Sequence, residues 1–219
     1  KLSAEQLVEK LADANITVRT LATNELVDRM GKQAVEPARR ALAESSIPEQ
    51  RAHALWVVER LAGLTPEEIR ALASDPTAIV RVHLVRALGE RPDWGTSEVR
   101  SIILDLLAGA DPFVQRVSAE ALGRHPHLDN INALLGVKPA EQDTHFAHTI
   151  QIALRNNLRD LGSIQQIAQT LGNRLALLDR FAEVSLGIPN ADAGSFILAY
   201  LQFHPDLARV PLDRRAEYF

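Results

Sequence analysis

The sequence predicts an all-α fold, a right-handed α-α superhelix of about six helix pairs with an atypical C-terminal end. One pattern of mainly apolar residues occurs five times, and its first positions lie 32, 30, 34 and 32 residues apart. Between the copies, apolar residues recur at helical spacing and no alternating strand pattern appears. A period near 32 residues without strands is typical of a solenoid, in which stacked helix pairs bury their apolar faces against neighbouring pairs. The copies begin at Val18, Gln50, Val80, Val114 and Phe146.

Each copy of the pattern predicts the second helix of a pair. Its first, fifth and ninth positions are about one turn apart, so they lie on one helix face. The fifth and ninth residues are Ala22 and Leu26, Ala54 and Val58, Leu84 and Leu88, Ser118 and Leu122, and Ile150 and Leu154.

The stretches before the pattern predict the first helix of each pair, because they also carry amphipathic spacing and end at breaker residues. Thr65-Pro66-Glu67-Glu68 and Thr96-Ser97-Glu98 predict N-caps. The glycines at helix ends predict C-caps. The apolar residues that mark these first helices are Leu7, Val8 and Leu11; Val35, Ala38 and Leu42; Ile69, Leu72 and Ala73; Val99, Ile102, Ile103, Leu106 and Leu107; and Leu128, Ile131, Leu134 and Leu135.

The pattern stops after Leu171-Gly172. We predict one domain over residues 1–219, with regular repeats over about 3–172 and atypical terminal helices over 173–219. Arg174–Leu186 and Ala191–Phe203 read as helices without the signature, and Leu212–Phe219 reads as the start of another. Because the chain opens without methionine and stops just after a helix start, we expect it to be excised from a longer protein.

Composition narrows the class of protein. The 219 residues are 46% hydrophobic and 24% charged, which is typical of a folded chain. The net charge of −4 comes from interspersed charges, so no basic face indicates nucleic acid. The absence of cysteine excludes disulfides, thiol nucleophiles and covalent haem attachment in this segment. No apolar run is long enough for membrane insertion, and no signal peptide is visible.

The segment Asp75–Gly89, with Asp-Pro before Val-Arg and Ala-Leu-Gly at its end, resembles the HEAT repeat. The resemblance implies that the Asp and the Arg pair between neighbouring repeats, as a structural ladder. An Asp at a helix N-terminus also stabilises unpaired amides, and Arg can bind two acceptors at once. Gln115 and Ala147 depart from the pattern, which interrupts the ladder. The expected ladder residues are Arg19, Arg51, Arg81, Asp75, Asp111 and Asp143.

Three strings give a narrower resemblance: Arg51–Leu61, Asp143–Arg155, and Leu186–Pro189 followed by Ala193–Leu201. They resemble the helical middle segment of large haem-binding, membrane-bound-dehydrogenase-like proteins of planctomycetes and verrucomicrobia. That family joins a propeller, a HEAT-like array and a cytochrome c module, which implies an extracytoplasmic or periplasmic location. Because the chain carries neither propeller strands nor a haem-attachment motif, we expect no cofactor and no redox chemistry in this segment.

Histidines offer two further hypotheses. His145 and His148 share a helix face near Asp143 and could bind a metal. An N-cap with surface or inter-repeat histidines explains these residues better, because no further ligand cluster is visible, and we predict no metal. His53 and His83 each stand three residues after the start of the pattern. We therefore expect them to stack in the seam between repeats, as neutral buried imidazoles.

In HEAT arrays the signature helix usually lines the concave surface, which implies that the third, sixth and seventh pattern positions face a groove. Leu55, Trp56, Val82 and Val85 would then form an apolar patch suited to a protein partner. Alternatively, the assigned face is displaced by one position and Trp56 packs against a neighbouring helix. The expected partner-binding residues are Leu55, Trp56, Glu59, Val82, Val85, Arg86, Arg116, Glu120, His148 and Gln151.

The predicted function is a non-catalytic scaffold that binds a protein or flanking domains of the same chain. One alternative is a nucleic-acid-binding array, which the acidic balance disfavours. Another is a HEAT-like lyase or glycosylase, for which Glu59, Trp56 and Glu120 are the only loose candidates. No nucleophile elbow, phosphate-binding glycine loop or Ser/His/Asp order is visible, so we predict no enzyme activity.

Overall fold

The computed structural model describes residues 1–172 and 174–203, and every element within them is helical, with no strand. The all-α prediction is therefore confirmed. The elements are α1 (Ala4–Lys10), α2 (Ile16–Asn24), the π-helix η1 (Glu25–Met30), the 3₁₀-helix η2 (Gly31–Ala34), α3 (Val35–Glu44), α4 (Pro48–Leu61), α5 (Pro66–Ala73), α6 (Ala78–Gly89), α7 (Ser97–Ala108), α8 (Pro112–Arg124), α9 (Leu128–Gly136), α10 (Thr144–Asp160), α11 (Ile164–Leu171), α12 (Leu175–Leu186) and α13 (Ala191–Phe203).

The helices follow the predicted segments closely. The five signature copies lie on α2, α4, α6, α8 and α10, and the predicted first helices are α1, α3, α5, α7 and α9. The stretches predicted as Arg174–Leu186 and Ala191–Phe203 form α12 and α13. The helix start expected at Leu212–Phe219 lies outside the described residues.

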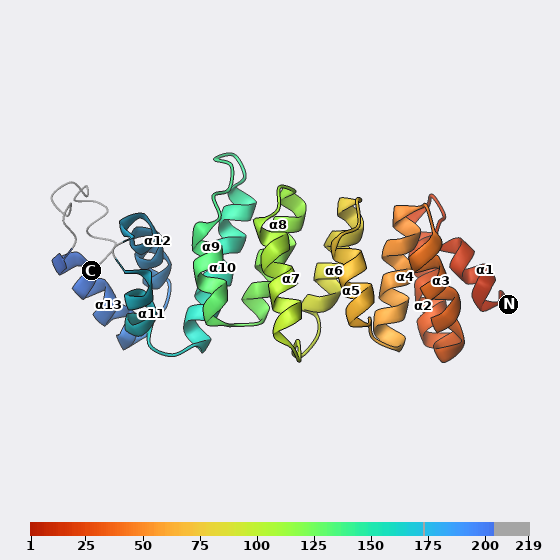
Figure 1. Ribbon diagram of the computed structural model, residues 1–219, viewed down its shortest axis with the longest axis horizontal. Helices are drawn as coiled ribbons and strands as arrows, with labels where there is room; N and C mark the ends of the chain where they lie inside the picture. Colours follow the sequence, from red (N-terminus) through yellow and green to blue (C-terminus); the bar gives the residue numbers. More distant parts are fainter. Residues whose placement is uncertain (173, 204–219) are drawn as a thin grey trace. The chain divides into compact units, whose positions relative to one another are not determined.

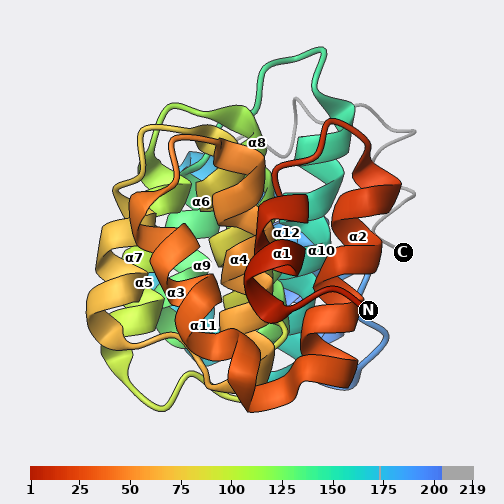
Figure 2. The ribbon, with the colours of Figure 1, turned by 90° about the vertical axis from the view of Figure 1, so that its right-hand side faces the viewer.

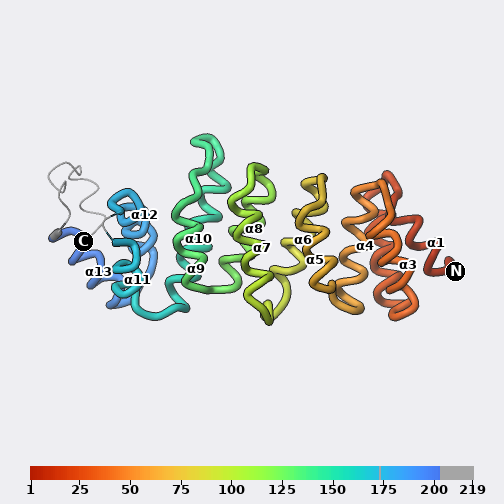
Figure 3. Tube along the Cα trace, in the orientation of Figure 1, coloured from red at the N-terminus to blue at the C-terminus, as the bar shows by residue number. Residues whose placement is uncertain are grey.

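The chain forms two compact units, Lys1–Ala121 and Leu122–Phe219, and α8 crosses from the first unit to the second. In the first unit the chain turns back after each helix, and successive pairs follow one another in sequence order (Figure 1 and Figure 3). Helix α4 packs on both α3 and α6, and α5 packs on α6 and α7. Viewed from the end, α3, α5 and α7 lie beside α4, α6 and α8 (Figure 2).

Helix starts show how local sequence determines the elements. Thr65 caps α5 through its side chain, and the Glu68 side chain accepts from the Thr65 amide, which completes the predicted capping box. Thr96 stands at the N-cap of α7, but its side chain makes no capping hydrogen bond. The sequence thus placed both starts, while only one of the two predicted caps forms.

Two glycines have a role that C-capping does not explain. Gly89 and Gly123 are buried in α6 and α8. A Cβ on Gly89 would meet the Ala121 Cβ at 3.2 Å, and one on Gly123 would meet the Ala153 Cα at 2.8 Å. Gly89 and Gly123 are the tenth residues of their pattern copies. The residues that they approach, Ala121 and Ala153, are the eighth residues of the copies that follow. These glycines allow close approach of neighbouring signature helices.

Replacing Gly123 by Ala should lower the free energy of unfolding by about 1–2 kcal/mol. The new methyl group meets backbone atoms that cannot rotate away, and this overpacking outweighs the better helix propensity of alanine. Urea denaturation followed by circular dichroism measures the change. Gly136, the last residue of α9, has open space at the corresponding position, so Gly136→Ala is the control and should change stability by less than about 0.5 kcal/mol. A stable Gly123→Ala variant would contradict the close-approach role.

The second unit contains a fully buried polar pair, Asn130 on α9 and Asn157 on α10. Asn157 Nδ2 donates to the carbonyls of Leu122 and Ala153, at 3.1 and 2.8 Å. Its Oδ1 accepts from Asn130 Nδ2 and from the His127 amide, both at 2.9 Å. The pair therefore ties the turn after α8 to α9 and α10.

Candidate partner-binding groove

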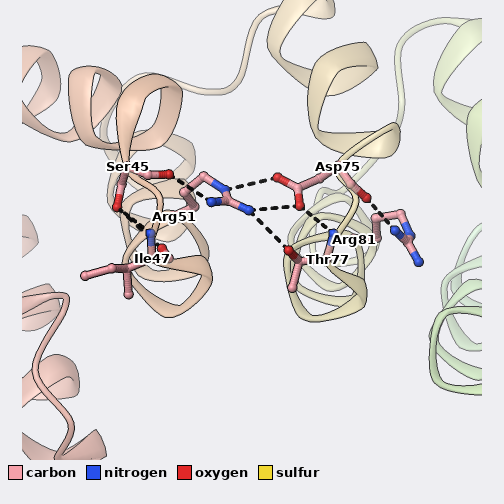
Figure 4. A network of polar contacts seen from close by, with 6 residues as sticks. All are labelled: Ser45, Ile47, Arg51, Asp75, Thr77 and Arg81. Carbon is pink, nitrogen blue, oxygen red and sulfur yellow. Dashed lines mark hydrogen bonds and ion pairs between the residues drawn. The ribbon is translucent and has the colours of Figure 1, made fainter.

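One of the predicted ladder contacts between neighbouring repeats is formed, the ion pair of Arg51 with Asp75. The Arg51 guanidinium donates from Nε and Nη2 to the two carboxylate oxygens of Asp75, both at 3.0 Å, and Nη2 also donates to Thr77 Oγ1 at 3.3 Å (Figure 4). The side chains of Arg51 and Asp75 are only 13% and 10% exposed, so solvent screens this pair weakly. It joins α4 to the loop that enters α6.

A second contact repeats in register and was not predicted. Nη1 of each signature Arg donates to the backbone carbonyl six residues earlier, in the turn before its own helix. Arg19 donates to Asp13 at 2.7 Å, Arg51 donates to Ser45 at 2.8 Å, and Arg81 donates to Asp75. In the fourth copy Gln115 Nε2 donates instead to the Leu107 carbonyl at 3.1 Å. The signature Arg therefore fixes the turn within its own helix pair.

The other two predicted ladder carboxylates, Asp111 and Asp143, accept hydrogen bonds from backbone amides. Asp111 Oδ1 accepts from the amides of Phe113 and Val114, and Asp143 Oδ1 accepts from the Phe146 amide, all at 3.0 Å. Both carboxylates are N-caps. Within residues 1–172 and 174–203, Arg81 makes no ion pair with Asp111, so the expected pairing of these two ladder residues is not formed. Asp75, by contrast, both accepts from the Thr77 amide at 2.8 Å and pairs with Arg51.

His53 and His83 lie in the seams between successive signature helices. Arg19 Nε donates to His53 Nε2 at 3.3 Å, and Thr23 Oγ1 lies 2.9 Å from His53 Nδ1. One repeat later, Trp56 Nε1 donates to His83 Nδ1 at 2.9 Å. Because Arg and Trp side chains are donors only, each imidazole must keep one ring nitrogen unprotonated. Burial lowers the pKa of both, that of His83 to about 4, with the positive charge of Arg86 adding to the effect at His83.

Stability should therefore fall as the pH falls from about 6.5 to about 4. In that window the unfolded chain binds a proton at His83 that the folded chain does not bind, and His53 acts in the same direction. Urea unfolding at about pH 7 and about pH 5 measures the loss. His83→Gln keeps an acceptor for Trp56 but does not titrate, so it should reduce the pH dependence. His145→Gln, at an exposed position on α10, should leave it unchanged. If His83→Gln and His145→Gln reduced the pH dependence of stability equally, the histidines in the seam would not be its source.

The predicted apolar patch is only partly exposed, because Trp56 and Val82 are of intermediate exposure and the other two residues are buried. Leu55 and Val85 are 0% exposed, and Ala52 and Ala119 are buried as well. The sixth pattern position faces neighbouring helices in the first four copies, and only Gln151 in the fifth is exposed there. The prediction was thus wrong for the sixth position, whereas Val82 and Arg116 at the third position and Arg86 at the seventh do line a groove. As the alternative interpretation held, Trp56 packs against α6 through His83.

The structure places a different groove between α6 and α8. Val82, Arg86 and Arg116, three of the predicted partner-binding residues, line it together with Ala78, Ile79, Phe113 and Val117. Its volume is about 230 Å³. Phe113 is 61% exposed and Ile79 is 38% exposed, which is high for side chains of this size. We call this site the α6–α8 groove.

The sequence contained a signal for the two residues that the prediction missed. Ile79 and Phe113 each immediately precede the first position of the pattern, at the start of a signature helix. An exposed apolar residue repeated at one register position is unusual for the solvent-facing start of a helix. Comparing that position between copies would have indicated the groove.

The other predicted site residues lie elsewhere. Glu59 accepts from Nε and Nη2 of Arg91, both at 2.7 Å, and from the Leu64 amide at 3.0 Å. Burial raises the pKa of Glu59, but these hydrogen bonds outweigh it and hold the pKa below its usual value. Glu120 is exposed on α8, beyond Arg116. His148 and Gln151 are exposed on α10 in the second unit.

Within the described part of the chain, no group of three His, Cys, Asp or Glu side chains is arranged to hold a metal ion. His145 and His148 are exposed on α10, and Asp143 caps that helix.

No family model and no curated protein matches this chain. None of the helices within residues 1–172 and 174–203 has the length and apolar character that a membrane crossing needs.

Proposed function

We propose that this chain is a HEAT-like helical-repeat scaffold that binds a protein segment in the α6–α8 groove. The observation that carries the proposal is the pair of exposed apolar side chains, Ile79 and Phe113, in a groove lined by apolar side chains apart from two Arg residues. Exposed aromatic and aliphatic groups next to Arg are typical of protein interfaces.

The repeat part of the proposal is supported by contacts that recur in register. The Arg-to-carbonyl contact and the Gly–Ala approach each occur at the same pattern positions in successive copies. His53 and His83 also share one pattern position, although their donors, Arg19 and Trp56, do not. Such nearest-neighbour contacts are what a right-handed solenoid needs, because each pair is stabilised by the next. Membership in a larger haem-binding dehydrogenase-like protein stays a prediction from the resemblance.

Two alternative functions have less support. Glu59 and Trp56, proposed for a lyase-type site, are held by Arg91 and His83 in structural contacts. A nucleic-acid groove would need a row of cations, and the α6–α8 groove supplies Arg86 and Arg116 in a chain of net charge −4.

The test selects peptides from a random displayed library on the purified chain. We expect a family of binders whose binding is lost in the Phe113→Asp variant. This variant should fold, because the side chain is mostly exposed and an acidic residue suits the first turn of α8. Leu21→Asp, at an equally exposed apolar position on α2, is the matched control and should keep binding. Failure to select any peptide, or equal loss in both variants, would reject the groove as the binding site.

A further inference from the structure

The α6–α8 groove also indicates the chemistry of its occupant. We propose that it binds a peptide segment in which one apolar side chain is flanked by carboxylates. The apolar side chain enters the groove, and the carboxylates meet Arg86 and Arg116. This inference rests on the proposed function and specifies its partner.

The size of the groove favours a single side chain. Its volume of about 230 Å³ is below the range of about 300–1,000 Å³ that is usual for small-molecule sites. Apart from the two Arg residues it is lined by apolar side chains, among them Ile79, Phe113 and Val117, and these carbon surfaces offer an inserted group no hydrogen bonds. An aliphatic or aromatic anchor suits such a site, because burial of its apolar area is the main favourable contribution.

The charge of the groove is positive although the chain as a whole is acidic. Arg86 comes from α6 and Arg116 from α8, and the Arg116 guanidinium lies 5.6 Å from the centre of the Phe113 ring. Among the residues that the structure describes, neither Arg makes an ion pair with a carboxylate. Asp111, just before α8, accepts through Oδ1 from the amides of Phe113 and Val114. The two guanidinium groups are therefore available to carboxylates of a partner.

The start of α6 adds to this field. Ala78 and Ile79, its first two residues, line the groove, and the side chain of the N-cap residue Thr77 makes no capping hydrogen bond. Its hydroxyl accepts from Arg51 instead. The Thr77 amide donates to Asp75 Oδ1 at 2.8 Å and the Val80 amide to the Thr77 carbonyl at 3.1 Å. The amides of Ala78 and Ile79 are therefore the ones that favour negative charge at this end of the groove. Together with the guanidinium groups, they select against a basic partner.

The experiment uses three labelled peptides of equal length and measures binding to the purified chain by fluorescence anisotropy. The first carries a central Phe flanked by Asp, the second carries the same Phe flanked by Lys, and the third carries Ala between Asp residues. Two partly exposed ion pairs should make the first peptide bind about 5- to 10-fold more tightly than the second at low salt, and added salt should reduce the difference. The third should bind more weakly than the first because it lacks the anchor.

A charge-reversed variant makes the test specific. In Arg86→Glu/Arg116→Glu the preference should invert, so that the Lys-flanked peptide binds more tightly. Arg40→Glu, which changes an exposed Arg on α3 outside the groove, should leave the preference for Asp unchanged. Circular dichroism checks that each variant folds.

Other outcomes overturn the inference and separate it from the proposed function. Equal binding of the Asp and Lys peptides, or no inversion in the double variant, would reject acidic flanks. If Phe113-dependent binders are still selected from the library, the groove remains a protein-binding site with another preference. Tighter binding of a labelled DNA duplex than of the acidic peptide, lost in the double variant, would instead assign the groove to nucleic acid.

Discussion

Replacing Asn157 by Ala is expected to lower the free energy of unfolding by about 3–4 kcal/mol, the largest loss that we anticipate for a single polar residue here. The side chain is 0% exposed and makes four hydrogen bonds, to Leu122, Ala153, Asn130 and His127. Alanine would leave a cavity, and the His127 amide would lose its acceptor in a region where water does not compensate. Urea denaturation followed by circular dichroism gives the value.

The neighbouring Asn156 supplies the control. It lies on the same helix, α10, and is partly exposed, so Asn156→Ala should change the free energy of unfolding by less than about 0.5 kcal/mol. If Asn157→Ala were as stable as Asn156→Ala, the asparagine pair would not hold the turn after α8 against α9 and α10.

Replacing Leu55 by Ala should lower the free energy of unfolding by about 2–5 kcal/mol, as is usual for a fully buried leucine. The result separates the two interpretations of the signature helix. If Leu55 lay in an exposed groove, its truncation would lower the free energy of unfolding only slightly. Because Leu55 is packed between its own helix, α4, and the neighbouring helices, truncation leaves a cavity that the helices cannot close without moving. Thermal and urea unfolding measure the loss.

The comparison variant is Ile79→Ala, in the α6–α8 groove. Ile79 is 38% exposed, so its truncation should lower the free energy of unfolding by less than about 1 kcal/mol while weakening peptide binding. The opposite order of the two losses would mean that Leu55 faces solvent and that the sequence-based face assignment was right.

Of the long-range polar contacts, the sequence predicted one and not another. The pairing of Arg51 with Asp75 was anticipated from the repeat pattern, since both residues stand at fixed pattern positions. The pairing of Asn130 with Asn157 was not anticipated, because a single sequence does not distinguish a buried asparagine from one at the surface. Only the partners that the fold brings within hydrogen-bonding distance distinguish them.

The sequence by itself determined the α-helices and their order, but not the π-helix η1 and the 3₁₀-helix η2. These features depend on local causes: apolar spacing along each helix, breakers between helices, and caps such as Thr65 with Glu68. The tertiary structure alone decided which face of each signature helix is covered. Successive helical residues point about 100° apart, so a displacement of one position exchanges a buried side chain for an exposed one. For that reason Leu55 and Val85 are core residues, while Ile79 and Phe113 lie at the groove.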